Sequence, residues 1–368
     1  MQRDELAAWL RLEMTPGVGR GTARRLLAAF GLPQQVFSQP PAALGRVVGA
    51  GQLDALQSEP QGWTEQVERT WRWLLEPDEG TSRRVFTLAD ADYPPSLLQT
   101  ADPPLLLYAS GMAVAAWPAA IAVVGSRNPT PQGELNARQF SRSFAQSGLT
   151  VVSGLALGVD GAAHEGALEG AAPGQLATIA VVGTGLDRVY PRQHLSLAHR
   201  IAHHGLLLSE YPLGMGPLAE NFPQRNRIIS ALAQGTLVVE AALQSGSLIT
   251  ARLAAEQGRE VFAIPGSIHS PQSRGCHALL KQGAKLVETA QDVLEELAPA
   301  AVARPALAEE APATPLLQAM GFEPVGIDAL VARTGTATST LQAELLELEL
   351  QGLVARLAGG LFQRVSQG

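Results

Sequence analysis

The feature that most constrains the fold is a recurring unit made of a short β-branched run, a glycine-rich loop and a helix-like segment. The unit begins with IAVVGSR at residue 121 and returns as LTVVSG, ATIAVVGTG, LLLSEYP, TLVVEA and VFAI, which ends at residue 264. Short apolar runs bounded by Gly and Pro are typical of strands buried in a parallel sheet. The repetition therefore predicts an α/β fold with a Rossmann-like, doubly wound parallel sheet.

We expect this sheet to belong to a chain of three domains. The predicted divisions are an N-terminal helical domain resembling SAM or helix-hairpin-helix modules (1–80), the Rossmann-like domain (81–298), an Ala/Pro-rich linker (299–314) and a C-terminal winged-helix domain (315–368). Within the first domain, TPGVGRGTARRLL at residues 15–27 has two interpretations. Its glycine N–H groups bind a DNA phosphate, or it is a tight turn between packed helices.

The charge distribution limits how the chain can bind a polyanion. The formal net charge is −7, and lysine occurs only at positions 281 and 285, so nearly all positive charge comes from arginine. A nucleic acid would therefore contact a local basic patch and not a wholly basic domain. The helix predicted over residues 339–351 carries three glutamates and neither Arg nor Lys. We therefore expect the winged-helix domain to contact protein, or nothing, in place of duplex DNA.

Cysteine content and hydropathy restrict the compartment and the chemistry. The single cysteine, Cys276, cannot form an internal disulfide or a cysteine zinc cluster. No apolar run approaches the roughly 18–20 residues of a membrane span. The glycine-rich loops contain neither G-x-G-x-x-G nor G-x-x-x-x-G-K-[ST], which disfavours dinucleotide binding and excludes a P-loop. We expect a cytoplasmic protein with no cofactor, no metal and no membrane partner.

Groups that suit an anion follow several predicted strands at the points where the strands end. Gly125, Ser126 and Arg127 follow the first strand, and Gly154 follows the second. Because the carboxyl ends of parallel strands meet at one edge of a sheet, their loops converge there. Backbone N–H groups, hydroxyls and guanidinium groups together favour phosphate. The other candidates for this site are Arg225, Asn226, Arg227, Ser245, Gly246 and Ser247.

Several motifs occur in a fixed order along the central part of the chain. They include GSR (125–127), SGLALGVDGAAH (153–164), GTGLDRVYP (183–191), FPQRNRII (222–229) and VVEAALQSGSLITARLA (238–254). This order resembles the DNA-processing protein A (DprA/Smf) family over about residues 90–290. The resemblance implies a non-catalytic protein that binds and protects single-stranded DNA and loads a RecA-type recombinase in natural transformation or related recombination. It also implies a homodimer formed through the Rossmann-like domain.

The resemblance is consistent with specific roles for the candidate residues. Ser126 and Arg127 would hold one backbone phosphate, and residues 225–227 would carry the strand onward. Arg192 matches a position that is often basic in the family. Phe222 either stacks on a base or is a core side chain.

The sequence leaves two further questions open, the dimer face and a rival enzymatic function. The set His277, Leu279, Leu280 and Leu286 is predicted as the dimer face, and the alternative is that its leucines belong to the core of the same chain. The rival function is a nucleotide-hydrolysing enzyme that resembles phosphoribohydrolases, whose P-G-G-x-G-T-x-x-E loop supplies a catalytic glutamate. AQGTLVVE at residues 233–240 is the nearest match, but it lacks the paired glycine.

Overall fold

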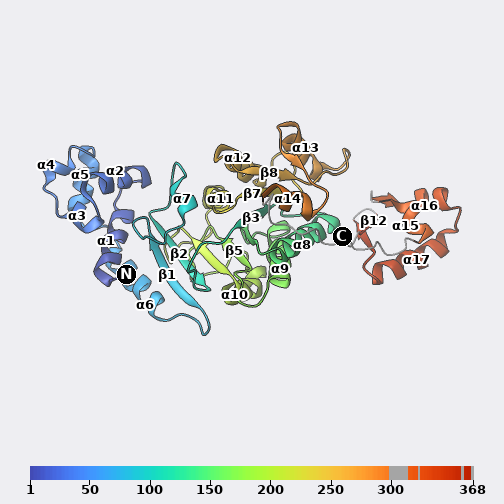
Figure 1. Cartoon of the computed structure of the whole chain (residues 1–368), viewed down its shortest axis with the longest axis horizontal. Coiled ribbons are helices and arrows are strands. Elements are labelled where there is room, and N and C mark those ends of the chain that lie inside the picture. The colour runs from blue at the N-terminus through green and yellow to red at the C-terminus, as the bar shows by residue number, and fades with distance from the viewer. Residues whose placement is uncertain (298–313, 322–323, 358–359, 366–368) are drawn as a thin grey trace.

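A computed structural model describes residues 1–297, 314–321, 324–357 and 360–365. Its central element is a nine-stranded sheet in the order β1-β2-β6-β5-β4-β3-β7-β8-β9 (Figure 1). Strands β3 to β9 run parallel to one another. Strand β2 pairs antiparallel with β6 on one side and with β1 on the other. The predicted Rossmann-like parallel sheet is confirmed. Its strands are β1 (Ser82–Thr87), β2 (Leu106–Gly111), β3 (Ala120–Val124), β4 (Thr150–Ser153), β5 (Thr178–Val181), β6 (Leu206–Ser209), β7 (Gly235–Val238), β8 (Glu260–Ala263) and β9 (Lys285–Leu286).

The strand order reverses at β3, and this reversal positions the site. From β3 the chain moves outward through β4, β5 and β6, and it then returns to place β7 on the other side of β3. The loops that leave β3 and β7 therefore turn to opposite faces of the sheet and leave a crevice between them. In open α/β sheets, ligands bind at such a switch point.

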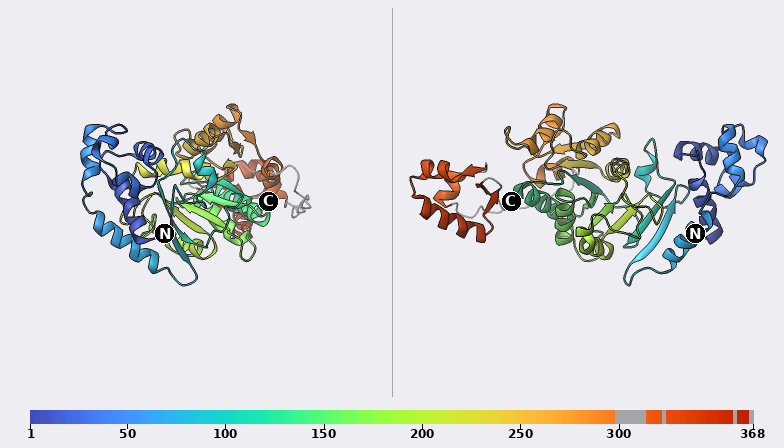
Figure 2. Two further views of the ribbon diagram at one scale, coloured as in Figure 1. Left: turned by 60° about the vertical axis from the view of Figure 1, so that its left-hand side comes forward. Right: turned by 180° about the vertical axis from the view of Figure 1, so that it is seen from behind.

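Side chains of alternate strand residues pack against different helices. Ala122 and Val124 contact a core with α11 (Asn221–Leu232), α12 (Ser247–Glu256) and α13 (Arg274–Lys281). Ile121 and Val123 face the opposite layer, which contains α8 (Pro131–Gln146), α9 (Val159–Gly170) and α14 (Ala290–Leu297). Helix α10 (Leu195–His204) covers β5 on this second side. Figure 2 shows the two helical layers from other directions.

Helices α8 and α9 pack closely because glycine lies at their contact. A Cβ atom at Gly166 would lie 2.0 Å from the backbone carbonyl oxygen of Arg138. We expect Gly166→Ala to lower the free energy of unfolding by about 1–3 kcal/mol, since the backbones must separate. The matched control is Gly21→Ala in α2, where the added Cβ meets nothing within 4 Å. Urea denaturation should show no loss for the control; equal losses in both variants would contradict the account.

The N-terminal helices share one core with the β1–β2 hairpin. Trp9 and Leu26 belong to the same buried cluster as Val85 and Tyr108. Figures 1 and 2 show these helices beside β1 and β2. The helices are α1 (Arg3–Met14), α2 (Arg20–Phe30), α3 (Pro33–Phe37), α4 (Pro41–Leu44), α5 (Ala50–Gln57) and α6 (Trp63–Leu75), and a short α7 (Pro95–Leu98) follows β1.

Arg20 forms ion pairs within the chain. It belongs to the segment at residues 15–27, for which one interpretation is a contact with a DNA phosphate. Its Nε lies 2.7 Å from Asp102, and its guanidinium lies 2.8 Å from Glu210 at the end of β6. Arg24 lies 3.5 Å from the same Asp102 carboxylate. These contacts tie α2 to the segments that flank the sheet.

The C-terminal unit has its own core and a three-stranded sheet. The helices are α15 (Pro315–Met320), α16 (Ile327–Thr334) and α17 (Thr338–Leu350), and the strands are β10 (Val325–Gly326), β11 (Val354–Leu357) and β12 (Leu361–Arg364), in the order β10-β12-β11. Leu330, Leu341 and Leu345 are buried in its core. The predicted linker lies outside the described residues except at Thr314. Within the described ranges, no helix is long and apolar enough to cross a membrane.

Candidate functional site

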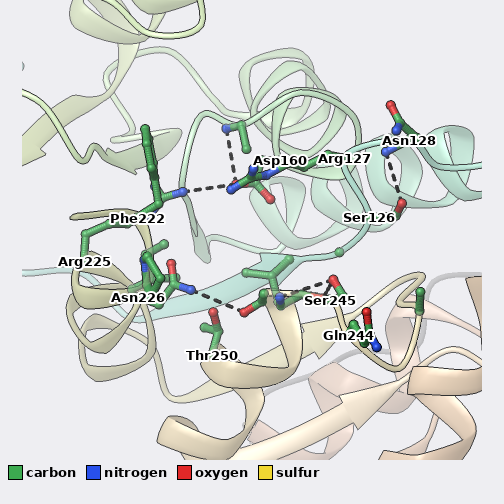
Figure 3. A pocket seen from close by; sticks show the side chains of 18 of the residues that line it. Ser126, Arg127, Asn128, Asp160, Phe222, Arg225, Asn226, Gln244, Ser245 and Thr250 are labelled. Carbon is green, nitrogen blue, oxygen red and sulfur yellow. Dashed lines mark hydrogen bonds and ion pairs between the residues drawn. The ribbon is translucent and has the colours of Figure 1, made fainter. Parts of the chain in front are cut away.

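A cavity of about 690 Å³ opens where the loops after β3 and β7 diverge. Figure 3 shows its walls: the end of β3 with Ser126 and Arg127, the first turns of α11, and the loop that leads into α12. The predicted residues that line it are Gly125, Ser126, Arg127, Phe222, Arg225, Asn226, Ser245, Gly246 and Ser247. Gly154, Arg192 and Arg227 do not line it. The switch point thus brings together nine of the twelve candidates.

Arg127 is the accessible cation of the pocket wall. Its side chain is exposed, and its Cζ lies 5.9 Å from the centre of the Phe222 ring. Beside it, Ser126 is buried, and its Oγ accepts a hydrogen bond from the N–H of Asn128 at 3.1 Å. The backbone turn after β3 is therefore fixed while the guanidinium group stays free to meet an anion.

The serine loop before α12 forms the opposite wall. The hydroxyls of Ser245 and Ser247 lie 2.7 Å apart, and Asn226 of α11 donates to the carbonyl of Gly246 at 3.4 Å. Helix α12 begins at Ser247, so the positive end of its dipole lies at this wall. Hydroxyls and a helix N-terminus suit an anion that enters beside Arg127.

Arg225 lines the pocket but holds the protein's own backbone. The side chain is 5% exposed and donates from one nitrogen to the carbonyls of Gly154 and Val181. Its other terminal nitrogen lies 3.8 Å from Asp160. Arg225 is a predicted phosphate contact, but its guanidinium group is buried and already bound to carbonyls and a carboxylate of the protein.

Gly154 is a candidate for the anion site, but its N–H group already donates a hydrogen bond within the protein. That N–H donates to the carboxylate of Asp160 at 3.1 Å. A Cβ at Gly154 would lie 2.0 Å from the Arg225 guanidinium, so glycine is what permits the close approach of this arginine. Gly154 therefore supports the pocket from behind and offers no free N–H to a ligand.

Arg227 lies on the other side of α11. Residues two apart on a helix point about 200° apart, so Arg225 and Arg227 cannot both face one strand of DNA. Arg227 binds Glu210, and it donates to the carbonyl oxygen of Asp102 at 2.6 Å. Arg227 therefore lies outside the cavity, with its guanidinium group bound within the protein. Arg192 is exposed in the 3₁₀ helix η1 (Arg192–His194), outside the pocket.

An aromatic pair forms the third side of the cavity. Phe222 is half-buried, and its ring centre lies 5.4 Å from that of Tyr190, with 40° between the planes. Tyr190 is 47% exposed and lines the cavity. Tyr190 is not among the residues predicted for the site, although an aromatic residue in the loop after a strand of a parallel sheet is a signal for it.

The proposed dimer residues do not form one apolar face. Leu279 is buried and Leu280 partly buried in the core beneath α13. His277 contacts the carbonyl of Gly266 at 2.9 Å. Leu286 is 54% exposed on β9, the edge strand of the sheet. Of this set, only Leu286 presents a largely exposed apolar side chain.

Comparison with known proteins places the chain in a family. The family model described as DNA recombination-mediator protein A matches residues 84–298. Protein Smf of Escherichia coli (strain K12) is 43% identical over 309 residues, which cover 80% of each protein. The chain belongs to the DNA recombination-mediator protein A family.

Further comparisons extend the similarity to both ends of this chain. Protein Smf of Synechocystis is 34% identical across 99% of this chain and 100% of its own length. A model of the DprA winged helix domain matches residues 298–360. DNA processing protein A of Streptococcus pneumoniae has a solved structure with a TM-score of 0.65, 35% identical over 80% of this chain and 98% of that one.

A second similar structure is that of DNA processing protein A from Helicobacter pylori. Its description concerns the single-stranded DNA binding mode of that protein. It is 32% identical over 58% of this chain and 95% of that one, with a TM-score of 0.52.

Proposed function

We propose that this protein binds single-stranded DNA as a recombination mediator. In this role it protects the strand and helps to load a RecA-type recombinase during natural transformation or related recombination. The observation that carries the proposal is the pocket at the strand-order reversal, where Arg127, the serine loop and the Tyr190–Phe222 pair face one cavity. The single-stranded DNA binding described for the Helicobacter pylori relative supports it.

The two kinds of wall match the two parts of a nucleotide. Arg127 and the N-terminus of α12 offer positive charge and hydrogen-bond donors to a backbone phosphate. Tyr190 and Phe222 offer apolar ring surface to an unstacked base. In duplex DNA the bases are stacked and paired, so a cavity with aromatic rings favours a single strand.

The remaining parts of the proposal concern assembly and location. We propose a cytoplasmic homodimer, formed through the β9 side of the sheet, with Leu286 as its accessible apolar contact. No cofactor or metal is assigned to the site. The winged-helix unit is proposed to contact protein, because exposed Leu346 and Leu350 on α17 accompany its glutamates.

Replacing Arg127 tests the phosphate contact. We expect Arg127→Ala to weaken binding to a labelled oligo(dT) by about 5- to 150-fold, equivalent to about 1–3 kcal/mol for a charge-assisted contact. Fluorescence anisotropy at fixed salt measures the change. The unfolding midpoint should stay the same, because the side chain is exposed.

A matched control separates this contact from net charge. Arg252→Ala removes an equally positive side chain from α12, where Arg252 is 69% exposed and does not line the cavity. The control should bind oligo(dT) like the wild type. Equal affinity of a folded Arg127→Ala variant and the wild type would remove Arg127 from the site.

Recombinase loading has its own assay. Strand exchange by a RecA-type recombinase is slow on DNA coated with a single-strand-binding protein, and a mediator shortens this lag. We expect the wild type to shorten the lag and Arg127→Ala to shorten it less. An unchanged lag with a protein that binds oligo(dT) would restrict the function to binding and protection.

The rival enzyme would need a free glutamate in the cavity. Glu240 follows β7, and its carboxylate accepts hydrogen bonds from the N–H of Thr130 at 2.9 Å and from its hydroxyl at 2.6 Å. It does not line the cavity. This placement favours a structural role at the start of α8. Release of adenine from AMP by the purified protein would favour the rival instead.

A further inference from the structure

The loop between β4 and α9 contains a strained residue. Leu155 has a φ of +58° and is the non-glycine residue with positive φ among the described positions. Side chains with a Cβ rarely adopt this conformation, which persists only where the surroundings hold it. The Leu155 side chain is itself buried against Leu197 and Ile201 of α10. Something must therefore fix both peptide groups of this residue.

One holding group is His164 of α9, which is fully buried. The hydroxyl of Thr178 donates to the carbonyl of Val151 at 2.6 Å, so its oxygen accepts from Nδ1–H of His164 at 2.7 Å. The unprotonated Nε2 then accepts the N–H of Leu155 at 3.3 Å. Burial lowers the pKa of His164 to about 3, so the ring stays neutral and keeps this acceptor.

The second holding group is His194, which comes from a different loop. Its Nδ1 lies 3.0 Å from the carbonyl oxygen of Leu155, which can only accept a hydrogen bond. The ring lies over Gly161 of α9, where a Cβ would be 2.7 Å from its Cε1. His194 ends η1, four residues after Tyr190. The hydrogen bond therefore ties the loop after β5 to the loop after β4.

Both loops contribute to the wall of the DNA-binding cavity. Ala156 lines it from the first loop, Asp160 from the first turn of α9, and Tyr190 from the second loop. Asp160 accepts the N–H of Ala156 at 3.3 Å, which continues the set of side chains that hold this backbone. The position of the aromatic wall relative to the rest of the cavity thus depends on the contacts at Leu155.

We propose that His164 and His194 are positioning residues of the single-stranded DNA site, which hold the strained Leu155 and thereby fix Tyr190 over the cavity. The proposal rests on the proposed function. Neither histidine needs to touch DNA: His164 is buried, and His194 is bound to a backbone carbonyl.

The test uses two substitutions of His194 in the full-length protein. In His194→Asn, the side-chain amide nitrogen lies near the position of the imidazole Nδ1 and can donate to the carbonyl oxygen of Leu155. In His194→Leu, the side chain has no donor. His199→Leu is the control, because His199 is exposed on α10. Hydrogen–deuterium exchange over residues 154–158 and 183–191 reports the two loops. Anisotropy with oligo(dT) reports binding, and urea denaturation reports global stability.

We expect His194→Leu to exchange faster in both loops and to bind oligo(dT) about 2- to 12-fold more weakly, as for the loss of one neutral hydrogen bond. His194→Asn and His199→Leu should match the wild type. Wild-type exchange and affinity in His194→Leu, or equal impairment in His194→Asn, would overturn the proposal. If the wild type does not bind oligo(dT), the proposed function fails, while the exchange data still decide whether His194 holds the loops.

Discussion

Arg225→Met is expected to lower the free energy of unfolding by about 3–5 kcal/mol, because it leaves a buried charge without its partner. The lost guanidinium group donates to the carbonyls of Gly154 and Val181 and lies beside Asp160, which is 10% exposed. Burial raises the pKa of Asp160, and Arg225 acts in the opposite direction. Urea denaturation at neutral pH measures the loss.

A double variant separates the charge pair from packing. In Arg225→Met combined with Asp160→Asn, no buried charge is left, and Asn can still accept the N–H groups of Gly154 and Ala156. We expect the double variant to lose less stability than the sum of the single variants. An Arg225→Met variant within 0.5 kcal/mol of the wild type, on the order of an ordinary surface substitution, would contradict the buried-pair account.

Glu13→Gln is expected to remove a strong dependence of stability on pH. Glu13 lies in α1, and its Oε2 is buried without a hydrogen-bond partner. Burial first, and then the charge of Glu210, raise its pKa to about 8, while Arg20 acts in the opposite direction. Its ordinary value is 4.5. Between these two values the folded chain keeps a proton that the unfolded chain has lost.

The sign of the effect follows from this proton. Wild-type stability should fall as pH rises from about 5 to about 8, by up to about 1.4 kcal/mol per pH unit from this group. Gln is neutral throughout, so the variant should match the wild type near pH 5 and exceed its stability near pH 8. Urea titrations at both pH values measure this difference. A constant difference between variant and wild type across this range would show that Glu13 ionises alike in both states.

Local patterns in the sequence predict the sheet and the place of the site. Each apolar run bounded by Gly or Pro became a strand, because such a run must be buried on both faces. The cavity lies between the loops after β3 and β7, which turn to opposite faces of the sheet because the strand order reverses at β3. One boundary differs: the strand expected to run to Ala241 ends at Val238, and Glu240 then turns to bind Thr130.

The roles of individual arginines depend on distant partners and could not be predicted. Arg225 and Arg227 look equivalent in the motif, but one is paired with Asp160 and the other with Glu210. Those carboxylates become visible only when the tertiary structure brings them to α11. Tyr190 follows a strand as other loop residues do, and its pairing with Phe222 of α11 becomes visible only in the folded chain.

The measurement that tests the central claim most directly compares wild-type binding to a labelled oligo(dT) with binding to a duplex of equal length over a salt series. We expect clear preference for the single strand. The logarithm of the binding constant should fall with the logarithm of salt concentration, with a slope of about −0.7 for each phosphate contacted. Because Arg127 is the accessible arginine among the described residues of the cavity, we expect a slope equivalent to few phosphates. No binding to oligo(dT) at low salt, or equal affinity for the duplex, would contradict the assignment of this cavity to single-stranded DNA.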